Sequence, residues 1–280
     1  MKIQIPEGAK KIIEQLNAHG FEAYVVGGCV RDSLLGRTPE DWDITTSAKP
    51  ETVKEVFKRT VDTGIQHGTV TVLLNKETYE VTTYRIDGEY EDARHPKTVE
   101  FTGDLLEDLK RRDFTINAMA YSDSDGLVDA FGGKMDLEQG VLRCVGNALD
   151  RFTEDALRIL RAVRFSAQLG FEIETETKKA ISAIAPNLEK VSKERVAAEL
   201  TKLLLSDHPE QIEAVFGYGM GVYVSPHFEE AGKRLSHTEK LCLLASEKHM
   251  RWAGFLRKET AQNASRILRE LKLDNDTINK

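Results

Sequence analysis

The character of the sequence changes near residue 140, and this change limits the possible folds more than any other feature. Before it, short β-rich runs alternate with helical ones; examples are EAYVVGG (22–28), DWDITT (41–46), and TVTVLL (69–74) followed by YEVTTYR (79–85). Asn75-Lys76 is the expected turn between the last two runs. After residue 140, apolar residues recur at helical spacing almost throughout. The pattern predicts an α/β head followed by an all-α remainder.

The composition is that of a soluble globular chain. Of its 280 residues, 40% are hydrophobic and 30% charged, and the length is sufficient for two or three domains. No apolar run approaches the ~20 residues that span a bilayer. The N-terminus has no signal-peptide pattern, and Cys29, Cys144 and Cys242 are too scattered for a disulfide framework or a zinc site. We therefore expect a cytoplasmic protein without a membrane partner. The net charge of -7 still allows a local basic groove.

Two acids follow a glycine turn in the stretch GGCVRDSLLGRTPEDWDITT. If DWDITT is a strand, Asp41 and Asp43 point the same way, and two such carboxylates repel each other. A divalent cation such as Mg²⁺ relieves this repulsion, since it prefers oxygen ligands and substrate phosphates. Gly27-Gly28 and Arg31 are suited to a triphosphate. The alternative for each residue taken alone is an ordinary turn or a solvated charge.

A polar stripe is expected on a helix from Phe152 to Phe165. Its members recur every three residues: Asp155, Arg158, Arg161 and Arg164. The structural alternative is a salt-bridged, solvated face in which Asp155 pairs with Arg158.

Four further motifs accompany the acids, in a fixed order. They are RRDFTINAMAY (111–121), DGLVDAFGGKMDL (125–137), EDALRILRAVRF (154–165) and KERVAAELTKLL (193–204). With the glycine and acid stretch, they make residues 24 to about 205 resemble a bacterial class II tRNA CCA-adding enzyme of the polymerase-β-like nucleotidyltransferase superfamily. Ala130 departs from the proline of many members, with little expected consequence. For the last motif we expect a mainly structural helix.

The resemblance implies an α+β fold: a nucleotidyltransferase head with a small mixed β-sheet and helices, followed by all-α neck and body domains. The head would span residues 1–140, the neck 141–205 and the body 206–280. The helical tail with which the family grips tRNA has no counterpart here. We therefore expect either a truncated piece or a short natural version.

The resemblance also implies the reaction: addition of CCA to the 3′ end of tRNA from CTP and ATP. The 3′-hydroxyl would attack the α-phosphate and release pyrophosphate, without a nucleic-acid template. Asp41 and Asp43 would be the catalytic ligands of Mg²⁺. Glu80 would complete the metal site as a third carboxylate, with a solvated strand residue as an equal alternative. The expected phosphate and ribose contacts are Gly28, Arg31, Arg112 and Asn117, although for Asn117 a structural cap or turn bond is an equal alternative.

Within the stripe, the resemblance implies a protein template for the incoming base. Asp155 would accept a hydrogen bond from the exocyclic amino group of cytosine or adenine, and Arg158 would donate to the ring nitrogen. Uracil and guanine would mismatch both contacts, which can reject a substrate by a factor of ~10⁴ or more. Arg161 and Arg164 would add phosphate or base contacts.

Several alternatives stay open. Within the family these are partial A-adding or CC-adding enzymes and bacterial poly(A) polymerases; a retained connector at Arg85–Asp108 favours complete CCA addition. Outside it, a catalytically silent RNA-binding module would not need both acids, and a phosphohydrolase would need a His-Asp metal cluster. The expected partners are tRNA, CTP and ATP, and a homodimer is compatible with the sequence.

Overall fold

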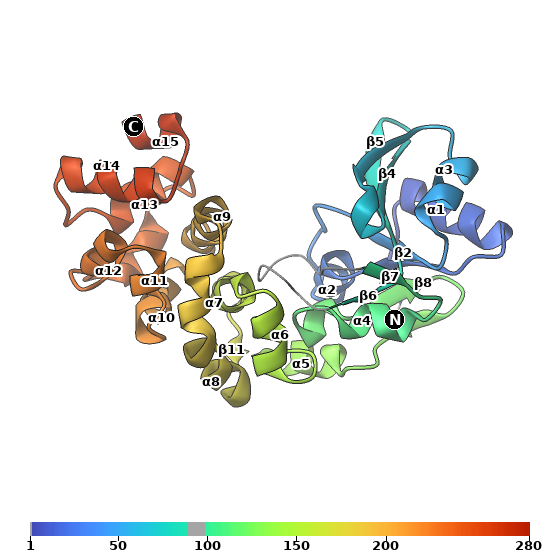
Figure 1. The fold of residues 1–280 in the computed structure, drawn as a ribbon, viewed down its shortest axis with the longest axis horizontal. Helices are drawn as coiled ribbons and strands as arrows, with labels where there is room; N and C mark the ends of the chain where they lie inside the picture. Colours follow the sequence, from blue (N-terminus) through green and yellow to red (C-terminus); the bar gives the residue numbers. More distant parts are fainter. Residues whose placement is uncertain (1, 89–98) are drawn as a thin grey trace. The chain divides into compact units, whose positions relative to one another are not determined.

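The computed structural model describes residues 2–88 and 99–280, which form two compact units (Figure 1). The first consists mainly of residues 2–88, 99–139 and 143–146, and the second mainly of residues 140–142 and 147–280. The division of the helical part into a neck (141–205) and a body (206–280) stays a prediction.

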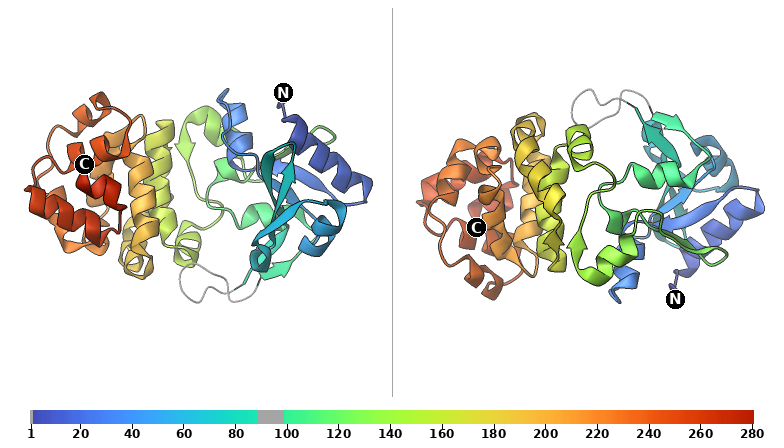
Figure 2. Two further views of the ribbon diagram at one scale, coloured as in Figure 1. Left: turned by 90° about the horizontal axis from the view of Figure 1, so that it is seen from above. Right: turned by 90° about the horizontal axis from the view of Figure 1, so that it is seen from below.

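The first unit is built on a mixed sheet of seven strands in the order β3-β4-β5-β2-β1-β8-β9. Figure 2 draws this unit in blue and green. The strands are β1 (Ala23–Val26), β2 (Ile44–Thr46), β3 (Thr60–Gly64), β4 (Thr69–Leu74), β5 (Glu77–Thr83), β8 (Ala120–Ser122) and β9 (Gly126–Val128). The β2–β5 pair is parallel, and the other pairs are antiparallel. The predicted α+β class with a small mixed sheet is confirmed.

The remaining elements of this unit cover and extend the sheet. They are α1 (Glu7–Ala18), α2 (Gly28–Leu34), α3 (Pro50–Val56), α4 (Leu105–Lys110), α5 (Gly133–Gln139), the 3₁₀ turns η1 (Ile65–His67) and η2 (Thr115–Asn117), and the hairpin β6 (Arg85–Asp87) with β7 (Val99–Phe101). α1 and α3 pack against each other and against the sheet (Figure 1). The predicted connector at Arg85–Asp108 lies in part, at 89–98, outside the described residues.

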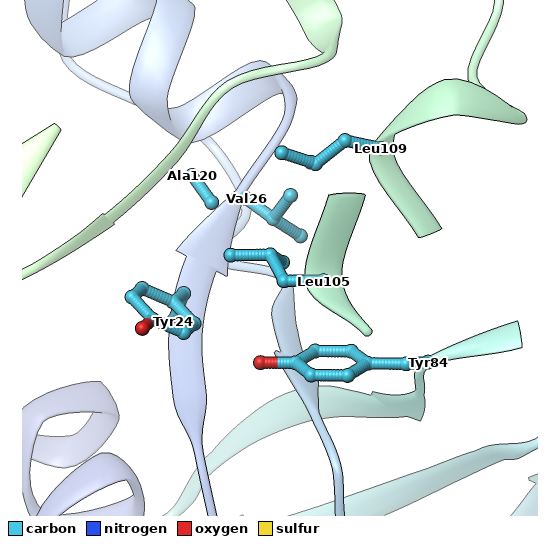
Figure 3. Packing of buried hydrophobic residues seen from close by; sticks show 6 residues of the cluster. All are labelled: Tyr24, Val26, Tyr84, Leu105, Leu109 and Ala120. Carbon is cyan, nitrogen blue, oxygen red and sulfur yellow. The ribbon is translucent and has the colours of Figure 1, made fainter. Parts of the chain in front are cut away.

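Helix α4 packs on the strand that leads to the glycine turn. Leu105 and Leu109 are one helical turn apart, so they share the buried face of α4. They pack in a cluster whose other buried members are Tyr24, Val26, Tyr84 and Ala120 (Figure 3). This apolar cluster fixes the end of β1, where the chain enters the turn.

The second unit is almost entirely helical, as predicted. Its helices are α6 (Ala148–Glu154), α7 (Leu157–Leu169), α8 (Thr175–Ile184), α9 (Lys193–Leu204), α10 (Ile212–Gly217), α11 (Gly221–Val224), α12 (Pro226–Gly232), α13 (Lys248–Phe255), α14 (Ala261–Glu270) and α15 (Asn275–Asn279). The 3₁₀ turns are η3 (Ala185–Lys190), η4 (Pro209–Gln211) and η5 (Thr238–Leu243), and β10 (Val141–Leu142) pairs with β11 (Glu172–Ile173). Within the described ranges, no helix is both long and apolar enough to cross a membrane.

The single helix predicted from Phe152 to Phe165 is wrong. α6 ends at Glu154, and α7 begins at Leu157. Asp155, between them, has an extended backbone with φ -141° and ψ 102°. The break occurs because Asp155 uses its side chain to accept from the backbone N–H of Leu157, which is the role of a helix cap. Gly170 ends α7 with φ 70°, in the left-handed region that favours glycine.

Candidate active site

The two acids of the first unit lie directly before β2, so the prediction that they belong to the strand is wrong. β2 begins at Ile44. Its partner β1 ends at Val26, next in register after the pair Val25–Ile44 and thus level with Asp43, and the chain turns away at Gly27, so strand pairing does not extend back to Asp41. The backbone N–H of Val26 donates to the carbonyl of Asp43 at 3.0 Å, which ties the acids to the start of the turn.

Glu80 lies on the neighbouring strand. β2 and β5 run parallel with Ile44 opposite Val81, so Asp43, the residue before β2, lies level with Glu80 on β5. Three carboxylates therefore gather at this part of the sheet: Asp41, Asp43 and Glu80.

The pKa of the Asp43 carboxyl is raised above its ordinary value of 3.8. The main cause is displacement of water by the surrounding protein, although part of the side chain still reaches solvent. The negative charges of Glu80 and Asp41 raise it further, against the positive charge of Arg112. A partly desolvated carboxylate next to like charges is stabilised by a divalent cation.

These carboxylates suit a metal that completes its shell from elsewhere. In residues 2–88 and 99–280, no three or more His, Cys, Asp and Glu side chains are grouped so as to hold a metal ion by themselves. Mg²⁺ is commonly held by one or two carboxylates together with water and substrate phosphates. The donor set at Asp41 and Asp43 therefore fits Mg²⁺ bound together with a nucleotide.

The glycine turn brings the backbone close to an arginine. Gly27 has φ 79°, in the left-handed region that favours glycine. A Cβ at this position would lie 3.0 Å from Nη1 of Arg112. Gly28 begins α2, and a Cβ there would lie 3.7 Å from Nη2 of Arg31. The structure thus brings Gly28, Arg31 and Arg112 together around the turn.

Arg31 is held in place by polar partners. Its Nε and Nη2 each donate to Asp32 at 2.9 Å, and Nη1 donates to Oδ1 of Asn117 at 2.7 Å. Asn117 in turn donates to Asp113 at 3.1 Å. Asn117 thus links α2 to the RRDFTIN segment through side-chain hydrogen bonds, and its contact with the ribose or phosphates stays a prediction.

Arg112 is anchored at one end of its guanidinium. Its Nη2 lies 3.4 Å from Oδ2 of the buried Asp108. Asp108 also accepts from Thr45 at 3.1 Å and from Arg111 at 2.8 and 2.9 Å. Among the described atoms, the buried Nε of Arg112 has no hydrogen-bond partner. Arg112 is thus held beside Gly27, and its Nε can still donate a hydrogen bond.

In the second unit, Asp155 does not pair with Arg158 through its side chain. Its Oδ1 accepts from the N–H of Leu157 at 3.0 Å, and its Oδ2 accepts from Nη2 of Arg195 at 2.7 Å. Arg158 instead donates to Glu154 at 2.9 Å and to the carbonyl of Arg151 at 3.2 Å. The solvated i,i+3 pair considered for the sequence is not formed. Each residue has its own protein partner.

Arg161 and Arg164 share one acid, Glu199 on α9. Nε of Arg164 donates to Oε2 of Glu199 at 2.6 Å, and the Arg164 guanidinium lies 3.7 Å from the ring centroid of Phe165. Nη1 of Arg161 lies 3.8 Å from Oε1 of Glu199, and its side chain is 32% exposed against 8% for Arg164. Arg164 is thus buried against Glu199 and Phe165, whereas Arg161 is the more exposed of the two; their contacts with a nucleotide stay a prediction.

Sequence reasoning missed Arg195 and Glu199. The motif KERVAAELTKLL was expected to be a mainly structural helix, yet it supplies a partner to Asp155 and one to Arg164. The available signal was the spacing: Arg195 and Glu199 lie one turn apart and carry charges opposite to their partners.

Two protein-family models match this chain, one mainly in each unit. Residues 23–143 match the family described as "Poly A polymerase head domain". Residues 170–231 match the one described as "Probable RNA and SrmB- binding site of polymerase A".

Individual relatives are similar over more of the chain. A CCA-adding enzyme of Lactiplantibacillus plantarum is 55% identical over 72% of this chain, and one of Geobacillus thermodenitrificans is 46% identical over 96%. This chain spans 50% and 67% of the lengths of these relatives. The crystal structure of a Bacillus stearothermophilus CCA-adding enzyme in complex with CTP matches with TM-score 0.89 and 39% identity, covering 99% of this chain and 68% of that one. The chain therefore belongs to the family of CCA-adding enzymes.

Proposed function

We propose that this chain catalyses addition of C, C and A to the 3′ end of tRNA from CTP and ATP, in the cytoplasm and without a nucleic-acid template. The observation that carries the proposal is the placement of Asp41 and Asp43 beside the Gly27 turn and Arg112, in a chain of this family. The 3′-hydroxyl of the RNA forms a bond to the α-phosphorus. The bond from the α-phosphorus to the leaving pyrophosphate breaks, and the hydroxyl proton passes to solvent.

Residues of the first unit handle the phosphates. Arg112 and Arg31 donate to the triphosphate, with the Gly28 backbone next to it, and their positive charge also favours the departing pyrophosphate. Asp41 and Asp43 would hold Mg²⁺, which when bound activates the 3′-hydroxyl and neutralises charge on the phosphates. Asn117 keeps Arg31 oriented through its hydrogen bond.

Residues of the second unit select the base. Asp155 accepts from the amino group that cytosine and adenine share, and Arg158 donates to the adjacent ring nitrogen. Arg161 adds a cation at the exposed side of the same cluster. A carbonyl beside an N–H, as in uracil or guanine, leaves both contacts unsatisfied.

The test is incorporation of single labelled nucleotides into three tRNA transcripts, which end before CCA, after its first C and after CC. Each receives CTP or ATP with Mg²⁺, and Asp41→Ala is the control. C addition to the first two transcripts and A addition to the third, all abolished in the control, is the expected result.

Other results identify the other members of the family. Activity on one class of transcript would make the chain a partial CC-adding or A-adding enzyme, and long runs of A would make it a poly(A) polymerase. Equal incorporation by the chain and by Asp41→Ala would contradict the proposed metal site.

A further inference from the structure

Asp108 on α4 lies next to a residue proposed to hold the triphosphate, yet no step of the proposed reaction uses it. We infer that Asp108 and Thr45 are positioning residues: together they fix the guanidinium of Arg112 relative to β2, the strand that follows the acids proposed to bind Mg²⁺. The inference rests on the proposed function and adds two residues that act on the triphosphate through Arg112.

The two oxygens of the Asp108 carboxylate have different partners. Oδ1 accepts from Nε and Nη2 of Arg111 at 2.9 and 2.8 Å. Oδ2 accepts from the hydroxyl of Thr45 at 3.1 Å and lies 3.4 Å from Nη2 of Arg112. The Asp108 side chain is 0% exposed and that of Arg112 is 19% exposed, so water competes weakly for these contacts. The carboxylate is therefore held at both oxygens, and Oδ2 joins the strand to the arginine.

Thr45 provides the fixed end of this connection. It is the second residue of β2, lies two residues after Asp43, and is paired with Tyr24 of β1. The carbonyl of Asp43 is itself tied to β1, because it accepts from the N–H of Val26 at 3.0 Å. The Thr45 hydroxyl is therefore a donor whose position is set by the same strand pair that holds Asp43.

Arg112 is the end of the connection that faces the glycine turn. Its Nη2 lies at Asp108, whereas its Nη1 would lie 3.0 Å from a Cβ placed on Gly27. The guanidinium is thus anchored at one nitrogen and presents another to the turn where the triphosphate is proposed to bind. A guanidinium that loses the anchor keeps its charge but no longer has a fixed direction.

The consequence concerns the triphosphate and not the base. Arg112 would donate to the phosphates while Asp41 and Asp43 hold the metal that binds the same phosphates, so their relative placement determines how tightly the triphosphate is held. The residues proposed to contact the base belong to the second unit. Loosening Arg112 should therefore weaken the binding of every nucleoside triphosphate by a similar factor.

The test compares Asp108→Asn, Thr45→Val and Thr45→Ser, with Thr46→Val as the matched control. Thr46 is the next residue of β2 and is buried like Thr45, but its hydroxyl donates to the carbonyl of Glu22 at 2.6 Å instead of to Asp108. For each variant of the chain, equilibrium binding of CTP, ATP and UTP is measured in the presence of Mg²⁺. Thermal unfolding reports whether the variant folds.

Thr45→Val should weaken the binding of CTP and ATP alike by roughly 3- to 10-fold, the range for loss of one hydrogen bond. Asp108→Asn should weaken it by roughly 10- to 100-fold, because the charge that anchors Arg112 is removed as well. Thr45→Ser keeps the hydroxyl and should bind like the unmodified chain. Thr46→Val should lose stability but not nucleotide affinity. The preference for CTP over UTP should change less than about twofold in every variant.

An unchanged CTP affinity in folded Thr45→Val would overturn the inference while the proposed function stands. Equal losses of affinity in Thr45→Val and Thr46→Val would do the same, because they would indicate a general effect on the strand. A lost CTP-to-UTP preference would also overturn it, since the effect would then not be confined to the phosphates. If the unmodified chain binds neither CTP nor ATP, the proposed function fails, and the inference fails with it. If Asp108→Asn does not fold, Thr45→Val decides alone, because it keeps every charge of the cluster.

Discussion

Among single residues, the acids before β2 lie close enough for their charges to repel one another. Asp43 is partly desolvated and lies near two like charges, so folding raises its pKa. A group that is harder to ionise in the folded state destabilises that state once it is charged. At neutral pH the charged Asp43 therefore makes the folded state less stable relative to the unfolded state. A bound cation would offset this loss.

Replacing Asp43 with asparagine should separate the two effects. We expect incorporation to fall by at least about 10³-fold, since a ligand of the catalytic metal is lost. In metal-free buffer the melting temperature should stay equal or rise slightly, because one of three like charges is removed. Activity assays and thermal unfolding with EDTA measure the two quantities. A clearly lower melting temperature would show that the Asp43 carboxylate stabilises the fold.

Asp108 is the opposite case, a buried acid whose charge is compensated. Burial alone would raise its pKa, but the charges of Arg111 and Arg112 and hydrogen bonds from Arg111 and Thr45 lower it below 3.8. Its ionised form therefore stabilises the folded state. Through these contacts it also connects β2, next to the acids, with Arg112.

Asp108→Asn should destabilise the chain by about 3 kcal/mol at neutral pH, because two arginines lose their buried counter-charge. Glu107→Gln on the same helix, where the side chain is 39% exposed, is the control, with an expected change within about 0.5 kcal/mol. Urea unfolding gives both values. Equal effects of the two substitutions would refute the proposed role of Asp108.

The pH dependence of the Asp108 contribution follows from the direction of its shift. A lowered pKa means that the folded state binds the proton more weakly than the unfolded state. The contribution is therefore complete above the ordinary value of 3.8 and is lost as pH falls through the lower folded pKa. The stability difference between the unmodified chain and Asp108→Asn should shrink on acidification from pH 7 to about pH 3. A difference that grows toward acid pH would contradict the sign.

At the scale of elements, the β4–β5 hairpin shows what local sequence can predict. Asn75 and Lys76 have φ of 53° and 70°, the left-handed pair that a two-residue hairpin turn requires. Asparagine tolerates this conformation, whereas lysine does so at a cost.

Lys76→Gly should therefore stabilise the chain by about 1 kcal/mol relative to Lys76→Ala. Both substitutions remove the same side-chain interactions, so the difference isolates the backbone conformation. Chemical denaturation of the two variants measures it. Equal stabilities would mean that the turn does not hold a left-handed backbone at position 76.

The break between α6 and α7 is a feature that the local sequence pattern does not predict. The spacing from Phe152 to Phe165 is helical, so the pattern predicts one continuous helix. Asp155 interrupts it by capping α7 and by binding Arg195, forty residues later in the chain. Likewise, the DWDITT pattern cannot reveal that β2 begins only at Ile44, because that depends on its partner β1, which turns away at Gly27. Alternation, turns and motif order were predictable; partners distant in sequence were not.

For the whole molecule, the two units carry different parts of the proposed chemistry. The first contains the carboxylates and the arginines around the glycine turn, and the second contains Asp155 with its supporting helix α9. Single relatives match the chain across both units, so both units belong to the same family of proteins. Nucleotide order must then come from protein side chains, since the proposed reaction uses no template strand.

The most direct measurement is to sequence the product formed from a tRNA transcript lacking CCA when all four nucleoside triphosphates and Mg²⁺ are supplied together. The proposed function predicts that the added sequence is CCA and that addition then stops. Incorporation of U or G at rates comparable with C and A, or continued addition beyond the terminal A, would contradict selection by the protein.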